Sequence, residues 1–203
     1  MMTETVRDWR VDPQRMADLH VRWGASMLSW LDTRMTGTVL DAGCGSGRVT
    51  ELLLDHLPDA DVVAVDSSQD RLDEAADRLA AAMLAGRLEL VLADLTEPLP
   101  VEPVDAVLST ATLHWIADHE RVFANLAAVL RPGGQLVVQC GGAGSLPTDE
   151  GDWREVGESW AGLTNFANPD DTRRRLEANG FVDVRTWLQD GDYARLNVIA
   201  RRA

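Results

Sequence analysis

Lysine is absent from the sequence: all 19 basic side chains are arginine, against 33 aspartate and glutamate side chains. The formal net charge is −14, which opposes the binding of nucleic acids, because these polyanions are held by basic surfaces. We therefore expect neither DNA nor RNA as a partner. The lack of lysine itself we ascribe to bias in the coding sequence, and it indicates no function.

Cysteine is scarce, and long apolar runs are missing. Cys44 and Cys140 fall in different predicted elements, which indicates neither a disulfide framework nor a metal cluster. No apolar run approaches the length of a membrane span, and the first ten residues are polar, unlike a secretory signal. We expect a cytoplasmic protein without a membrane partner, whose 203 residues form one domain. Its oligomeric state does not follow from the sequence.

The most informative stretch joins an apolar strand to a helix through a glycine-rich turn, Val39-Leu40-Asp41-Ala42-Gly43-Cys44-Gly45-Ser46-Gly47. Glycines in such a turn let a ligand approach the main chain closely, and helix packing against the strand is the alternative reason for them. A dinucleotide fingerprint requires a third glycine where Arg48 stands. The acidic Asp41 also suits a cationic ligand better than a pyrophosphate. S-adenosylmethionine, which carries an ammonium and a sulfonium but no phosphate, fits both observations better than NAD does.

Strand and helix patterns alternate along the chain. Apolar runs predict strands at 38–41, 61–65, 88–92, 104–108 and 135–140. Amphipathic periodicity predicts helices at 12–32, 48–57, 69–85, 120–130 and 169–179. Two last strands, 181–188 and 193–200, are expected to form an antiparallel hairpin. The pattern predicts a Rossmann-like, doubly wound, mostly parallel α/β sheet, divided into a helical segment (1–36), a cofactor-binding core (37–140) and a substrate-side region (141–203).

Acidic side chains follow the strand ends, where ligands bind in doubly wound sheets. Asp66 stands 25 positions after Asp41 (66 − 41), near the offset at which an acid binds ribose hydroxyls, with helix capping as its alternative role. After the third strand, we expect Asp94 to accept the adenine amino hydrogen and Leu95 to pack on the ring. The alternative for Asp94 is a solvated loop acid.

A second functional segment follows the fourth strand and contains Thr110, His114 and Trp115. If S-adenosylmethionine is the ligand and donates its methyl group, His114 is the candidate for positioning the acceptor, or for acting as a base if the acceptor is a hydroxyl or amine. The alternative is that His114 and Trp115 only pack against the donor and seal its pocket. In the first helix, Arg22 is a candidate for holding a carboxylate through two hydrogen bonds, and surface solvation is its alternative.

Five motifs together resemble the class I S-adenosylmethionine-dependent methyltransferases, over about 12–140. They are 39–47, Ala64-Val65-Asp66-Ser67, Ala93-Asp94-Leu95, 104–115 and Leu130-Arg131-Pro132-Gly133-Gly134. Within that class, two further stretches look like the branch that holds trans-aconitate methyltransferase and the malonyl carrier-protein methyltransferase, which both esterify a carboxylate. These stretches are Leu113-His114-Trp115-Ile116 and Tyr193-Ala194-Arg195-Leu196-Asn197.

The resemblance implies a seven-stranded sheet whose antiparallel last strand is inserted beside the fifth. It implies S-adenosylmethionine as the cofactor and a small-molecule acceptor, a carboxylic acid by likeness to the branch. A non-catalytic S-adenosylmethionine-binding module, or methylation of a hydroxyl or amine, are the alternatives. The residues it assigns to the cofactor are Asp41, Gly43 and Gly45 at the methionyl end, Asp66 at the ribose, Ser67 at a flank of the adenine, and Asp94 with Leu95 at the adenine itself. Cys44 and Thr110 are further candidates for binding the cofactor.

The chain departs from that branch near its end. Branch members usually carry a helical insertion between the last two strands that helps cover the substrate, whereas the link here is only about 189–192. A more open site, a covering partner subunit, a different substrate or a lost activity would each account for this departure.

Overall fold

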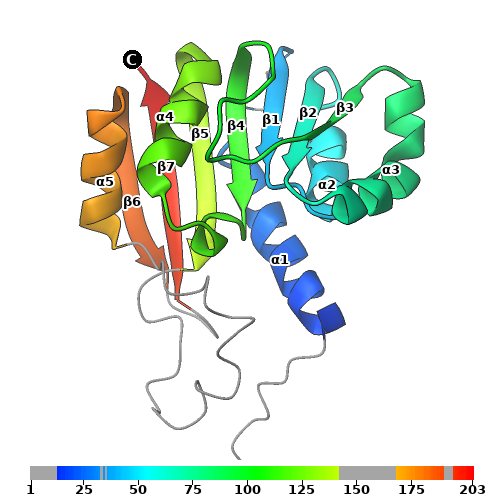
Figure 1. The fold of residues 1–203 in the computed structure, drawn as a ribbon, viewed down its shortest axis with the longest axis horizontal. Coiled ribbons are helices and arrows are strands. Elements are labelled where there is room, and N and C mark those ends of the chain that lie inside the picture. The colour runs from blue at the N-terminus through cyan, green and yellow to red at the C-terminus, as the bar shows by residue number, and fades with distance from the viewer. Residues whose placement is uncertain (1–12, 33, 35, 142–167, 190–193) are drawn as a thin grey trace, which may run out of the picture.

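The computed structural model describes residues 13–32, 34, 36–141, 168–189 and 194–203. Within these ranges, a seven-stranded sheet has the order β3-β2-β1-β4-β5-β7-β6 (Figure 1). Its strands are β1 (Thr38–Ala42), β2 (Asp61–Asp66), β3 (Leu88–Leu92), β4 (Val104–Thr110), β5 (Leu130–Gly141), β6 (Phe181–Gln189) and β7 (Arg195–Arg202). The helices are α1 (Pro13–Leu28), α2 (Arg48–His56), α3 (Gln69–Leu84), α4 (His119–Val129) and α5 (Pro169–Ala178), with a 3₁₀ helix η1 at Leu113–Trp115.

Pairing within the sheet is parallel except along β7. β1 pairs with both β2 and β4, and the parallel ladder continues to β3 on one side and β5 on the other. The strand order reverses between β1 and β4, which is the switch point where doubly wound sheets bind ligands. β7 pairs antiparallel with β5 and β6. The predicted Rossmann-like fold, with the antiparallel last strand beside the fifth, is confirmed.

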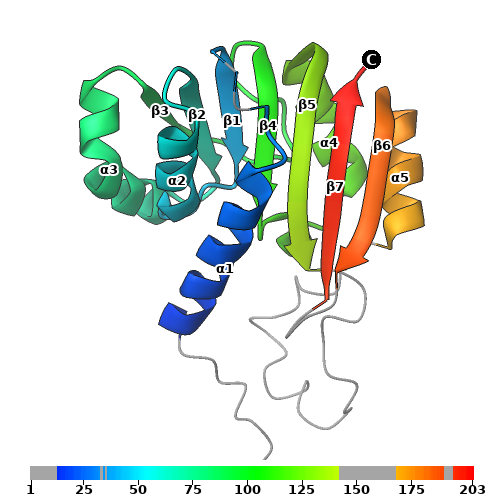
Figure 2. The same cartoon turned by 180° about the vertical axis from the view of Figure 1, so that it is seen from behind.

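Helices cover both faces of the sheet, so most strands are buried on two sides. α1, α2 and α3 pack on one face (Figure 2), where Leu53 of α2 joins strand residues such as Val39 and Leu108. α4 and α5 pack on the other face (Figure 1), where Phe123 of α4 joins residues such as Val107. Burial on both sides explains why the strands read as continuous apolar runs. The connection 93–103 between β3 and β4 contains no helix and crosses the second face (Figure 1).

Two element boundaries differ from the prediction. α1 ends at Leu28 and not near residue 32, because the main chain turns there and the Trp30 N–H donates to the Met27 carbonyl at 2.9 Å. β5 begins at Leu130 and not at residue 135, because Leu130 already pairs with Val104 before a register shift in the ladder. The Pro-Gly-Gly segment, 132–134, therefore lies within β5, and α4 ends before it at Val129.

Candidate functional site

The glycine-rich turn between β1 and α2 lies at the carboxyl edge of the sheet, and its three glycines have different reasons to be there. Gly43 (φ 86°) lies against Thr112, since a Cβ would come within 2.3 Å of that side chain. Gly47 packs on α3, where a Cβ would lie 2.8 Å from Leu79. Gly45 (φ 54°) faces open space, with no heavy atom within 4 Å of a Cβ position. The main chain is therefore open to a ligand at Gly45.

Asp66, at the end of β2, holds this turn in place. One carboxylate oxygen accepts the Gly45 N–H at 2.8 Å, and the other accepts the Ser68 N–H at 3.0 Å. A carboxylate accepts up to about four hydrogen bonds, so these two contacts do not exhaust Asp66. Ser67 is exposed beside it, and Ser68 caps α3 by accepting from the Arg71 N–H. The contacts of Asp66 with ribose and of Ser67 with adenine stay predictions.

Asp41 is fully buried at the end of β1. Its Oδ2 accepts the Thr50 hydroxyl at 2.7 Å, while its Oδ1 has no hydrogen-bond partner among the described residues. Burial raises the pKa of Asp41 to about 6; the Thr50 hydrogen bond opposes this rise, and the Asp66 charge adds to it. A cation nearby would favour the ionised carboxylate, which is the setting predicted for the methionyl end.

Cys44 contributes to the turn through its main chain. The N–H groups of Gly43 and Cys44 both donate to the Val65 carbonyl, at 2.8 and 2.9 Å. The thiol is buried, and burial followed by the charges of Asp41 and Asp66 raises its pKa above the ordinary value. A thiol that stays protonated is a poor nucleophile, so these surroundings disfavour a nucleophilic role for Cys44.

Asp94 and Leu95 follow β3 but differ in their surroundings. Asp94 is exposed, and its Oδ1 accepts both the N–H and the hydroxyl of Thr96 at 2.8 Å. These bonds, the main-chain one first, hold the pKa of Asp94 below its usual range, so the side chain is ionised. Leu95 is 5% exposed in the core, and its carbonyl accepts from Asn125 at 2.9 Å. Contact of either residue with adenine stays a prediction.

The end of β4 has a main-chain conformation that sequence patterns did not indicate. Ala111 has φ 51°, in the left-handed region, and its N–H donates to the Gln139 carbonyl at 2.8 Å. Such strain persists only where the surroundings impose it, and it gathers at functional sites. The turn carries Thr112 back to Gly43, whose carbonyl accepts the Thr112 hydroxyl at 3.2 Å. Thr110, predicted in the pocket, is buried at this strand end.

His114 lies in η1 with its ring buried. Its Nδ1 accepts the N–H of Gly141, at the end of β5, at 3.2 Å. In a neutral imidazole, an accepting Nδ1 places the proton on Nε2. The Trp115 side chain is half-exposed, and its ring centroid lies 5.2 Å from that of His114. His114 is therefore arranged as a hydrogen-bond donor, whereas the predicted role as a base would need the other tautomer.

Arg22 of α1 and Arg195 of β7 have different surroundings. Arg22 is exposed on the helix, and its carboxylate-binding role stays a prediction. The adjacent Trp23 instead meets Arg195, whose guanidinium carbon lies 5.2 Å from the ring centroid. Arg195 pairs across from Gly141, beside the contact of His114. Sequence reasoning missed Arg195, because only the β5–β7 register brings it here. The resemblance of residues 193–197 to the branch is the sequence signal that could have pointed to Arg195.

Comparison with known proteins agrees with this geometry. A family model described as a methyltransferase domain matches residues 40–138. Trans-aconitate 2-methyltransferase of Azoarcus sp. (strain BH72) is 36% identical over 125 residues, which cover 62% of this chain and 47% of that protein. The protein of the same name from Yersinia pestis (strain Pestoides F) is 30% identical over 181 residues, covering 88% and 67%. The chain belongs to the class I S-adenosylmethionine-dependent methyltransferases.

The likeness extends to solved structures. Phosphoethanolamine N-methyltransferase 2 of Haemonchus contortus, solved with S-adenosyl-L-methionine, matches 89% of this methyltransferase and 52% of its own chain, with a TM-score of 0.72 and 18% identity. At that identity the likeness concerns the fold alone. This methyltransferase spans about half the length of the first curated relatives, 47% and 50%. None of its described helices is long and apolar enough to cross a membrane.

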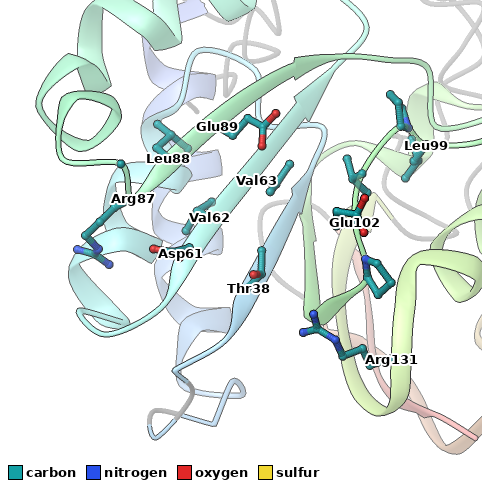
Figure 3. A pocket seen from close by; sticks show the side chains of 14 residues that line it. Thr38, Asp61, Val62, Val63, Arg87, Leu88, Glu89, Leu99, Glu102 and Arg131 are labelled. Carbon is teal, nitrogen blue, oxygen red and sulfur yellow. The ribbon is translucent and has the colours of Figure 1, made fainter.

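A hollow of about 560 Å³ lies at the opposite edge of the methyltransferase sheet, by the amino ends of β1, β2 and β3 (Figure 3). Val63 and Glu89 lie on the strand side, and the connection 99–103 lies across from them with Arg131 (Figure 3). Arg131 pairs with Asp105 at 2.5 Å, and Arg87 donates to three carbonyls at and beyond the end of α2. No predicted site residue lines this hollow, so it is separate from the carboxyl edge.

Proposed function

We propose that the protein transfers a methyl group from S-adenosylmethionine to a carboxylate of a small organic acid. The observation that carries this proposal is the pairing, at one sheet edge, of open main chain at Gly45 with a buried carboxyl group at Asp41. Membership in the methyltransferase class supports the cofactor. The names of the relatives support the acceptor, because trans-aconitate is a carboxylic acid.

The residues at this edge fit the cofactor. The first turn of α2 presents main-chain N–H groups and the positive end of the helix dipole, which suit the methionyl carboxylate. Oδ1 of Asp41, without a partner among the described residues, suits a positive group of the same end. Asp66 beside Gly45 would bind the ribose hydroxyls, and the exposed Asp94 would accept from the adenine amino group.

A carboxylate acceptor agrees with the setting of His114. When bound, S-adenosylmethionine supplies a methyl group activated by a sulfonium. A hydroxyl or amine acceptor must lose a proton to a base, but Nδ1 of His114 is occupied by the Gly141 N–H and Nε2 holds the proton. A carboxylate is already ionised and attacks without a base. His114 then donates to the acceptor and orients it.

The contribution of the protein is orientation and the exclusion of water. Holding two reactants in line is worth up to about 7–11 kcal/mol. Trp115, half-exposed next to His114, is placed to cover the acceptor. β6 ends at Gln189 and β7 begins at Arg195, so the segment between them is too short for the helical insertion of the branch. We infer that η1, α1 and the start of β7 form the acceptor side.

The test is a transfer assay with methyl-labelled S-adenosylmethionine and a panel of carboxylic acids, alcohols and amines. We expect label in a product that releases methanol on treatment with alkali, because only the ester is cleaved in this way. Label confined to an alkali-stable product would replace the acid by a hydroxyl or amine acceptor. Tight cofactor binding without transfer to any member of the panel would instead support a non-catalytic binding module.

A further inference from the structure

Arg195 begins β7 at the carboxyl edge of the sheet, on the face covered by α1. Its partner across the ladder is Gly141, whose N–H donates to His114 at 3.2 Å. Arg195 therefore lies one strand away from the contact that orients His114. Its guanidinium carbon lies over Trp23 of α1, 5.2 Å from the ring centroid, in a cation–π contact. A cation is thus held next to the residues that we infer to form the acceptor side.

The Arg195 side chain is partly buried, and one of its hydrogen-bond donors has no acceptor among the described residues. Its Nε is buried and has no hydrogen-bond partner among the described residues. Burial lowers the pKa of Arg195, although a guanidinium stays charged at neutral pH. A buried charged donor without an acceptor is costly, and an anion in contact with it would remove that cost. The local energetics therefore favour an anionic ligand.

A row of buried polar side chains fixes the main chain of Arg195. Thr110, Gln139 and Asn197 lie in register on β4, β5 and β7. Gln139 Nε2 donates to Asn197 Oδ1 at 2.6 Å, and Asn197 Nδ2 donates to the Arg195 carbonyl at 3.4 Å. Gln139 Oε1 is also buried without a partner among the described residues. The polar groups of this row thus extend from the end of β4 to the main chain of Arg195.

We propose that Arg195 binds a carboxylate of the acceptor that is not itself methylated, so that the acceptor is a di- or tricarboxylic acid. This inference rests on the proposed function. The cation–π contact with Trp23 does not use the N–H groups of the guanidinium as hydrogen-bond donors, and these groups suit a two-point contact with a carboxylate. The oxygens so held share their lone pairs with the guanidinium and become poorer nucleophiles. The attacking oxygen therefore belongs to another carboxylate of the same molecule.

Arg195 is better suited to this role than Arg22. Arg22 is exposed on α1, and an ion pair formed at an exposed site is screened by water and salt. Arg195 is partly buried and oriented by the ring of Trp23, so less side-chain freedom is lost when a carboxylate binds. We therefore place the proposed carboxylate contact at the start of the last strand, at Arg195, and not on the first helix.

The test compares wild type with Arg195→Gln and Arg195→Lys, each saturated with S-adenosylhomocysteine. Titration with trans-aconitate, succinate and butyrate measures binding without turnover. We expect Arg195→Gln to weaken trans-aconitate and succinate by about 10- to 100-fold, to leave butyrate unchanged, and to leave S-adenosylhomocysteine affinity unchanged. Arg195→Lys keeps the charge but not the planar fork, so its loss falls in between. In turnover, KM for the polycarboxylate rises while kcat is retained.

Arg201→Gln is the matched control, because Arg201 lies on the same strand and face but donates to the Gly133 carbonyl at the far end. Equal succinate affinity in wild type and Arg195→Gln would overturn the inference, as would equal wild-type affinity for succinate and butyrate. If wild type and Arg195→Gln both methylate butyrate and succinate equally well, the proposed function stands, but Arg195 does not bind a second carboxylate of the acceptor. If wild type binds S-adenosylhomocysteine but none of the acids, both the role of Arg195 and the proposal of a carboxylate acceptor are wrong.

Discussion

The carboxyl group of Asp41 is fully buried, and its pKa connects folding stability with cofactor binding. Its value in the folded protein is about 6, against 3.8 in the absence of burial, so the folded state holds the proton more tightly than the unfolded chain does. The contribution of Asp41 to stability is therefore highest below pH 3.8, falls as the pH rises from 3.8 to about 6, and stays low above that. The difference between these two pKa values corresponds to ~3 kcal/mol of folding free energy. A bound cation would offset this cost.

Replacement of Asp41 by asparagine removes the ionisation but keeps an oxygen that can accept from Thr50. We expect Asp41→Asn to be more stable than wild type by about 2–3 kcal/mol at neutral pH, and the gain to disappear toward about pH 4. Urea unfolding across this range measures it. The exposed Asp55→Asn on α2 is the control and should show no such gain. A variant no more stable than wild type at neutral pH would contradict the raised pKa.

The open face of Gly45 gives a second expectation for a single residue. An alanine at φ 54° is strained by about 1–2 kcal/mol, and its Cβ meets no protein atom. Gly86 is the matched control, because it has φ 72°, equally open surroundings, and a position in the turn between α3 and β3. Both alanine variants should lose similar stability in urea. Only Gly45→Ala should weaken S-adenosylmethionine, by about tenfold or more in calorimetric titration. Equal affinities in the two variants would place the cofactor elsewhere.

Besides the apolar packing of α1 on the sheet, one side chain of β5 forms hydrogen bonds with the segment that directly follows this helix. The Gln135 Nε2 donates to the Trp30 carbonyl at 2.5 Å, and its Oε1 accepts the Asp32 N–H at 3.3 Å. The side chain is 7% exposed, so both contacts are largely shielded from water. Because α1 carries Trp23, this attachment also holds the ring on which Arg195 stacks.

Gln135→Leu keeps the apolar contacts of the side chain and removes both hydrogen bonds. We expect a loss of about 1–3 kcal/mol in urea unfolding, because main-chain groups after α1 are left unpaired. Hydrogen exchange should accelerate in α1 and not in α2. Gln69→Leu on α3, which removes an exposed hydrogen bond to Asp73, should change neither. Unchanged exchange in α1 of the Gln135 variant would show that the helix is held by apolar packing alone.

Helices and strands that depend on interactions between residues close in sequence were predicted with nearly the right bounds. The apolar run 88–92 is β3 without change, and the predicted helix 48–57 differs from α2 at its last residue only, because periodicity and the turn residues act within a few positions. The segment at 130–134 was not recognised as strand, since its pairing of Leu130 with Val104 is a long-range contact.

The site residues divide in the same way, into those with a local sequence signal and those that depend on long-range pairing. Asp41 and Asp66 follow their own strands, whereas Arg195 reaches the edge only through the β5–β7 register. The positive φ of Ala111 could not be predicted, because alanine has no preference for that conformation.

Over the whole molecule, the formal net charge of −14 acts on ligands before they reach the site. S-adenosylmethionine carries a net charge of about +1 at neutral pH, from its ammonium, sulfonium and carboxylate groups, whereas S-adenosylhomocysteine lacks the sulfonium charge and is neutral. The acidic protein therefore attracts the methyl donor and has no such effect on the spent cofactor. The polycarboxylate acceptor that we propose would be repelled at long range, and its binding would depend on local contacts such as the one with Arg195.

Ionic strength separates these effects. Between about 0.01 M and 0.15 M salt the Debye length falls from about 30 Å to about 8 Å, so long-range attraction is lost while contacts at partly buried groups persist. We expect Kd for S-adenosylmethionine to rise roughly threefold, the effect of about one kT on a unit charge, and Kd for S-adenosylhomocysteine to stay constant. Over the same range, succinate should bind the S-adenosylhomocysteine complex more tightly, since the repulsion is screened more than its contact with Arg195. Equal shifts for both cofactors would mean that binding depends on the contacts at Gly45 and Asp66 and not on the acidity of the chain.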